Sequence, residues 1–79
     1  MVNVNEILSI IRENTTNIDV SKLDFTERLR EQGIDSLDMI SILFAIEESY
    51  QIKIPEEDLE SEKLTSIEGI LNYIGARIK

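Results

Sequence analysis

The chain contains no cysteine and no histidine among its 79 residues. Without cysteine it can form neither a disulfide framework nor a thiolate metal site, and without histidine it lacks the commonest zinc ligand. A single proline and an aromatic content of 5% argue against a domain built from many β-strands. The core must therefore be aliphatic, and a hydrophobic content of 42% is enough for one small helical domain over residues 1–79.

Basic residues are also scarce: eight Lys and Arg stand against sixteen Asp and Glu, which gives a net charge of −8. Phosphate backbones and anionic membranes bind mainly Lys and Arg, so this charge disfavours nucleic acid and membrane surfaces as partners. It would attract partners with basic patches, unless the acidity serves only solubility. No apolar run of about 18 residues occurs, and the first residues, MVNVNEILSI, lack the positive start of a secretory signal. We therefore expect a cytoplasmic protein without membrane insertion.

Hydrophobic periodicity predicts a first helix near the N-terminus and a second helix in the middle of the chain. The apolar stripe of the first helix comprises Val4, Ile7, Leu8 and Ile11. We expect Asn3 or Asn5 to cap this helix, which should end near Asn14 because polar residues then break the pattern. The second helix begins in DSLD and runs to about Gln51.

Two further helices are predicted near the C-terminus. Pro55 can open a short third helix through EEDLES, in which Leu59 is the only large apolar residue. The last helix covers TSIEGILNYIGARI and begins with a capping box formed by Thr65 and Glu68. Its apolar stripe consists of Ile67, Ile70, Leu71 and Ile74. The predicted fold class is all-α, a small four-helix bundle with three main helices and a short third one.

A long loop separates the first two predicted helices, from about Asn14 to Asp35. A loop of this length is unusual in so small a domain and is usually functional or partly helical. The stretch FTERLREQ could supply a short helical turn before Gly33. The apolar residues that should attach the loop to the core are Ile18, Val20, Leu23, Phe25 and Leu29.

The second helix has two apolar stripes instead of one. At about 100° per residue, the stripe that should face the core contains Met39, Ile42, Leu43, Ile46 and Tyr50. The second stripe contains Leu37, Ile40 and Phe44, with polar neighbours at Asp38, Ser41, Glu47 and Glu48. Either this helix is central and packed on both sides, or the second stripe is exposed and docks a partner that carries a basic patch.

Ser36 lies at the start of the second helix, and its role is open on these residues alone. Asp35 and Asp38 have the spacing of a capping pair, so DSLD could simply begin a helix. A catalytic serine would need a neighbouring base, and there is no histidine to supply one. A calcium loop in DVSKLDFTERLR fails, because Asp24 stands where glycine is needed and Arg30 where a bidentate glutamate belongs. What remains is a serine presented for modification at a helix N-terminus, where the dipole stabilises an attached phosphate.

The stretch GIDSLDMISILFAIEESYQIKIPEEDL strongly resembles the acyl carrier proteins around their G-x-D-S-L attachment motif, and the similarity extends over nearly the whole chain. The resemblance implies a four-helix bundle that is a carrier and not an enzyme. Ser36, which matches the attachment serine, would receive 4′-phosphopantetheine from coenzyme A through a phosphopantetheinyl transferase that uses magnesium. The arm would supply the thiol that this chain lacks, and acyl groups would be held on it as thioesters.

The resemblance also implies a partner-binding surface that comprises Asp35, Leu37, Asp38, Ile40, Ser41, Phe44, Glu47 and Glu48. Its partners would be the transferase, acyltransferases, ketosynthases and other synthase enzymes with basic docking patches, and the carrier would be a monomer. Fatty-acid synthesis is the expected pathway. A carrier for polyketide, nonribosomal peptide or other specialised synthesis stays open, because Ser41 replaces a frequent acid and Phe44 is bulkier than the usual residue. An unmodified acidic helical adaptor is the alternative from another class.

Overall fold

The computed structural model of the chain describes residues 3–16, 18–59 and 61–78. These ranges contain four α-helices, three short 3₁₀ helices and no strand. The α-helices are α1 (Val4–Glu13), α2 (Ser36–Tyr50), α3 (Glu56–Leu59) and α4 (Ile67–Arg77). The 3₁₀ helices are η1 (Val20–Lys22), η2 (Leu29–Gln32) and η3 (Glu62–Leu64). The predicted all-α class, with three main helices and a short third one, is confirmed.

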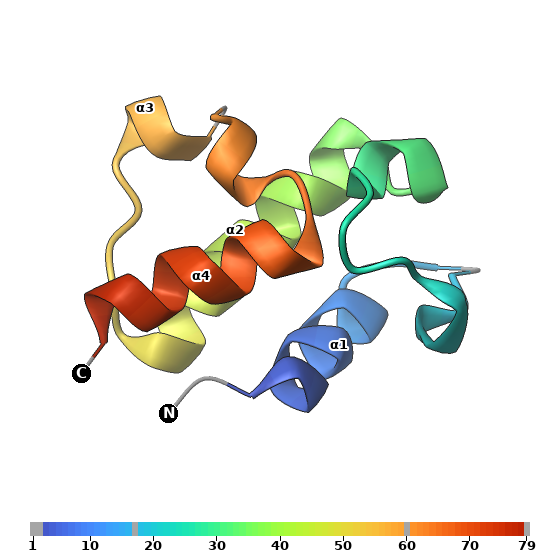
Figure 1. Cartoon of the computed structure of the whole chain (residues 1–79), viewed down its shortest axis with the longest axis horizontal. Coiled ribbons are helices and arrows are strands. Elements are labelled where there is room, and N and C mark those ends of the chain that lie inside the picture. The colour runs from blue at the N-terminus through green and yellow to red at the C-terminus, as the bar shows by residue number, and fades with distance from the viewer. Residues whose placement is uncertain (1–2, 17, 60, 79) are drawn as a thin grey trace.

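The buried core is almost entirely aliphatic and lies among the three longer helices. α1 packs against both α2 and α4, whereas α3 lies at the edge of the molecule (Figure 1). The predicted stripes of α1 and α4 lie in or against the core, with Val4, Leu8 and Leu71 half-buried. The prediction missed one buried residue in each helix, Ile10 and Tyr73. The segments between the helices add buried side chains that periodicity did not indicate, namely Ile34, Ile54 and Leu64.

Side-chain caps determine where the helices begin. Of the two candidates at the start of α1, Asn3 is the cap, and its side chain accepts a hydrogen bond from the Asn5 N–H at 2.7 Å. Ser66 caps α4 by accepting a hydrogen bond from the Gly69 N–H at 3.0 Å. The predicted capping box of Thr65 and Glu68 is therefore wrong.

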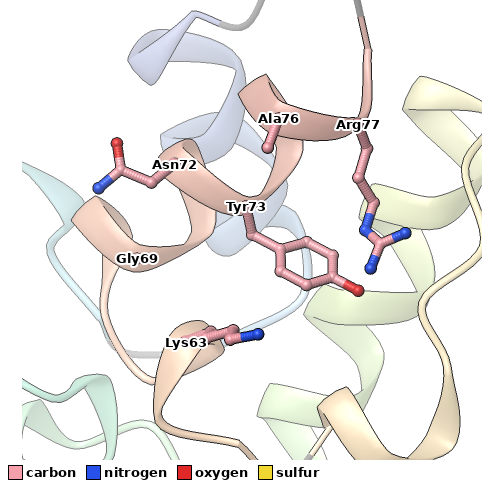
Figure 2. A pocket seen from close by; sticks show the side chains of 6 residues that line it. All are labelled: Lys63, Gly69, Asn72, Tyr73, Ala76 and Arg77. Carbon is pink, nitrogen blue, oxygen red and sulfur yellow. The ribbon is translucent and has the colours of Figure 1, made fainter.

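The 3₁₀ helix η3 explains why the start of α4 is shifted by one residue. The Thr65 hydroxyl donates to the Glu62 carbonyl at 2.9 Å, so this side chain closes η3 and does not cap α4. The close packing of η3 on α4 requires glycine at position 69, because a Cβ there would clash with the Lys63 carbonyl oxygen. Figure 2 shows both residues beside the hollow that they help to line.

The long loop between α1 and α2 is attached to the start of α4 by backbone hydrogen bonds. The Leu29 N–H donates to the Thr65 carbonyl at 2.8 Å, and the Glu68 N–H donates to the Phe25 carbonyl at 2.9 Å. Leu29 is fully buried, as expected, and Ile18, Val20 and Leu23 pack partly buried against the core. Phe25 differs from the prediction: its side chain is 41% exposed, so only its backbone attaches the loop.

The predicted helical turn before Gly33 is present as η2. The Gln32 side chain accepts a hydrogen bond from the Asp24 N–H at 2.7 Å and donates one to the Asp24 carbonyl at 2.9 Å. Gly33 ends η2 with a φ of 100°, a left-handed conformation that costs other residues more than it costs glycine. These contacts fix the segment that leads into α2.

Polar contacts hold α3, which has four residues and none of them buried. Asp58 accepts a hydrogen bond from the Tyr73 hydroxyl at 2.7 Å and forms an ion pair with Arg77 at 3.3 Å. The Arg77 guanidinium also lies 4.4 Å from the centre of the Tyr73 ring, and Figure 2 shows the two side chains next to each other. One carboxylate thus connects α3 to α4.

We expect Ser66→Ala to lower the free energy of unfolding by about 1 kcal/mol, because it removes the α4 cap. Ser66→Asp should retain most of the stability, since aspartate also caps helices well. Thr65→Ala is the matched control and should cost less, because its exposed hydroxyl only closes η3. Urea denaturation of the three variants measures these differences. A larger loss in Thr65→Ala than in Ser66→Ala would contradict the assignment of the cap.

Two tyrosines should make the protein less stable at high pH. Burial and the hydrogen bond to Asp58 raise the pKa of Tyr73, and burial and the hydrogen bond to Glu6 raise the pKa of Tyr50, both from 10.0. Because folding favours the protonated phenols, their contribution is complete below the unfolded-state pKa and is lost as pH rises through the raised values.

The measurement is the free energy of unfolding between about pH 8 and pH 11, compared between the parent and Tyr50→Phe/Tyr73→Phe. The double variant should lose less stability over this range, because the two proteins differ only in the two phenols. Parallel losses in the two proteins would show that the tyrosines do not contribute.

Candidate functional site

Ser36 is the first residue of α2, and its side chain is exposed. The residue that caps this helix is Asp35, whose carboxylate accepts a hydrogen bond from the Asp38 N–H at 2.8 Å. Asp35 is therefore the cap, as the spacing of Asp35 and Asp38 suggested, and Ser36 is not. Its hydroxyl stands at the positive end of a helix of 15 residues and is not needed to begin that helix.

A groove of about 540 Å³ begins beside Ser36. Its apolar lining comes from α2, α3 and η3 and comprises Met39, Ile40, Leu43, Phe44, Leu59 and Leu64. Its polar lining comprises Arg30, Ser36, Glu56, Ser61 and Thr65. A mainly apolar groove next to an exposed hydroxyl can shelter an apolar chain that is attached through that hydroxyl.

The second apolar stripe of α2 is exposed. Leu37 is 75% exposed, Phe44 55% and Ile40 46%, whereas the first stripe of this helix faces the core and contains Met39, Ile42, Leu43 and Ile46 as buried residues. The alternative in which α2 is packed on both sides is therefore wrong. Ile40 and Phe44 also line the groove, so the groove and the exposed stripe form one continuous surface beginning near Ser36.

The predicted polar neighbours of this stripe have different environments. Asp35, Ser41 and Glu48 are exposed, and Asp38 is half-buried. Glu47 is half-buried, and its carboxylate accepts a hydrogen bond from the Ile54 N–H at 2.6 Å. Glu47 therefore connects the end of α2 to the segment that precedes α3. The periodicity of α2 did not indicate this role, because the chain reverses at Gln51, where φ is 54°.

The part of the groove formed by α3, η3 and η2 was not identified from the sequence. The sequence predicted no place in a site for Arg30, Glu56, Ser61, Leu64 and Thr65. They line the groove because the fold brings η2, α3 and η3 to it. One signal was available: Leu59 is the only large apolar residue in EEDLES, and it lines the groove.

A second hollow, of about 590 Å³, lies on the outer face of α4 and is open to solvent (Figure 2). Its lining comprises Lys63, Gly69, Asn72, Tyr73, Ala76 and Arg77 and includes none of the predicted site residues. Within the described ranges, acidic side chains form no group of three that could hold a metal ion. In the same ranges, no helix combines the length and the apolar character needed to cross a membrane.

Comparison with known proteins identifies the family. A family model described as the phosphopantetheine attachment site matches residues 5–74. An acyl carrier protein of Campylobacter lari is 34% identical over 65 residues, which cover 82% of this chain and 80% of that protein. An acyl carrier protein of Campylobacter jejuni subsp. doylei is 32% identical over 75 residues, 94% of each chain. One of Campylobacter concisus is 44% identical over 46 residues, which cover 58% of this chain and 57% of that protein.

An exposed serine beside an apolar groove is compatible with the attachment of a phosphopantetheine arm, which the matched family model describes. The matched model describes a phosphopantetheine attachment site, and the three relatives share one name. From these matches we conclude that the chain belongs to the acyl carrier protein family and is a phosphopantetheine-dependent carrier, not an enzyme.

Proposed function

We propose that this chain holds acyl intermediates as thioesters on a 4′-phosphopantetheine arm attached to Ser36 and delivers them to synthase enzymes. Residues 1–79 act as one carrier domain in this proposal. The observation that carries it is the exposed Ser36 side chain, which stands at the N-terminus of α2 and lines the apolar groove. The arm supplies a thiol, which a chain without cysteine cannot provide itself.

The residues around Ser36 fit such an arm. The exposed hydroxyl is accessible to a transferase, and the N-terminus of α2 stabilises the negative charge of a phosphodiester. The Asp35 cap holds the first turn of α2 in place, so attachment at Ser36 leaves the start of the helix unchanged.

The groove supports an aliphatic cargo. Its apolar side chains can cover part of an acyl chain, and each methylene group moved out of water contributes about 0.8 kcal/mol. The groove is open along the exposed stripe of α2, so the same chain can leave it when a partner docks there. This arrangement lets one surface both shelter the cargo and present it.

Family carriers interact with transferases and synthase enzymes, and the exposed stripe of α2 is the surface we propose for these contacts. Its apolar part consists of Leu37, Ile40 and Phe44, and its acidic neighbours Asp35, Asp38 and Glu48 suit a basic patch on the partner. The carrier would act as a monomer in the cytoplasm.

Fatty-acid synthesis is the pathway we propose. A carrier dedicated to specialised synthesis is the second candidate, and the large exposed surface of Phe44 favours it, because this ring adds a feature that a partner can select. The unmodified adaptor is disfavoured by the match to the attachment-site model.

The first test of this proposal is the intact mass after incubation with coenzyme A, magnesium and a permissive phosphopantetheinyl transferase. The parent should gain the mass of one phosphopantetheine, and Ser36→Ala should gain none. Ser49→Ala is the matched control, because this serine is also exposed on α2 but lies outside the predicted partner-binding surface, and it should be modified like the parent.

Ser36→Ala should also keep its fold and lose less than the roughly 1 kcal/mol of a helix cap, since Asp35 is the cap. Modification of the Ser36→Ala variant, or its absence from the parent, would exclude Ser36 as the attachment site.

Glu48→Lys should slow association with the transferase at least about threefold at low salt and much less at high salt, because salt screens exposed charges. Stopped-flow association rates measure this effect. Glu13→Lys is the control, since it makes the same charge change at an exposed position of α1. Glu47 is unsuitable, because its carboxylate holds the Ile54 N–H. Equal slowing by the two variants would contradict docking on α2.

A further inference from the structure

Among the residues that the structure describes, Arg30 is the one basic residue that lines the groove beside Ser36. It belongs to η2, and its side chain is exposed. Within the described ranges, the ion pairs are Arg28 with Glu62 and Arg77 with Asp58, and Arg30 takes part in neither. The function proposed above gives this guanidinium no role.

A positive group near Ser36 would stabilise a phosphodiester attached there, because the neighbouring side chains are acidic. Asp35 and Asp38 lie next to Ser36 in the sequence, so a phosphodiester on Ser36 would add a negative charge to a segment that already carries two. Neighbouring like charges repel each other. The α2 N-terminus offers only about half an elementary charge, and its Asp38 N–H already donates to Asp35. A full positive charge on the same groove would offset the remaining repulsion.

We propose that Arg30 binds the phosphodiester oxygens of the arm attached to Ser36 and so keeps the first part of the arm at the mouth of the groove. This inference rests on the function proposed above. A guanidinium suits the role because its parallel N–H groups bind two phosphate oxygens at once.

The backbone of Arg30 is well placed to support such a contact. On one side, Leu29 is fully buried and its N–H donates to the Thr65 carbonyl. On the other side, the Gln32 side chain is bonded to the Asp24 backbone. The base of the Arg30 side chain is therefore fixed, and only the side chain itself has to be ordered when it binds the phosphate.

Arg28 provides a matched control two residues earlier in the chain. Its guanidinium contacts both carboxylate oxygens of Glu62 at 3.0 Å, and it does not line the groove. Arg28→Gln and Arg30→Gln remove the same charge from the same segment. A general effect of net charge would appear in both variants, and a contact with the arm only in Arg30→Gln.

The experiment compares apo and modified forms of the parent, Arg30→Gln and Arg28→Gln, with intact mass confirming one arm in each modified protein. The first readout is the change in melting temperature on attachment. The melting temperature of the modified form minus that of the apo form should be higher in the parent than in Arg30→Gln by roughly 1–5 °C at low salt. This difference between the two proteins should shrink at about 0.5 M salt, because salt screens the charges. Arg28→Gln should keep the parental change.

The second readout is the NMR signal of the arginine Nε–H groups in the parent alone. The Arg30 signal should shift on attachment and the Arg28 signal should not. This readout needs no variant, so it stays decisive even if Arg30→Gln accepts no arm.

The two failures are distinguishable. If the parent gains no arm, the proposed function and this inference fall together. If the parent is modified but the Arg30 signal does not move, and Arg30→Gln changes as Arg28→Gln does, only the role of Arg30 is overturned.

Discussion

One hydrogen bond, from the Asp38 N–H to the Asp35 carboxylate, determines where α2 begins, and the candidate site depends on that start. Because Asp35 is the cap, Ser36 becomes the first helical residue and its hydroxyl remains exposed. Packing against α1 then buries Met39, Leu43 and other core residues of α2 and leaves the Leu37–Ile40–Phe44 stripe in solvent. The proposed attachment point, one side of the groove and the proposed docking surface therefore all lie on α2.

The opposite side of the groove is held in a different way. α3 buries no residue, and polar contacts connect it to its neighbours: Asp58 to Tyr73 and Arg77, and Glu47 to the Ile54 N–H just before it. Contacts of this kind contribute about 1 kcal/mol each, much less than a buried aliphatic cluster. Together with the half-buried Leu59, these contacts hold α3 less firmly than the core is held, which would suit a groove that admits and releases an acyl chain as proposed.

The net charge of the whole chain and the charges next to Ser36 have different consequences. The overall charge of −8 favours association with basic partners at long range. Next to Ser36, the acids that serve this purpose would also repel a phosphodiester, and Arg30 is the positive group that lines the same groove. Acidity for partners and a local positive charge for the arm are therefore compatible on one small surface.

Much of this arrangement was determined by the sequence alone. Periodicity and capping residues predicted the three longer helices and the short third one, and the two stripes of α2 followed from its side chains, because these features depend on neighbours within about one helical turn. The motif around Ser36 indicated the family. Tertiary structure decided the rest: that the second stripe is exposed, that Phe25 does not enter the core, and that Ser66 and not Thr65 caps α4. Arg30, Leu64 and Thr65 line the same groove as Ser36 only because the fold brings η2 and η3 to it. Contacts between segments distant in the chain leave no periodic signal in the sequence.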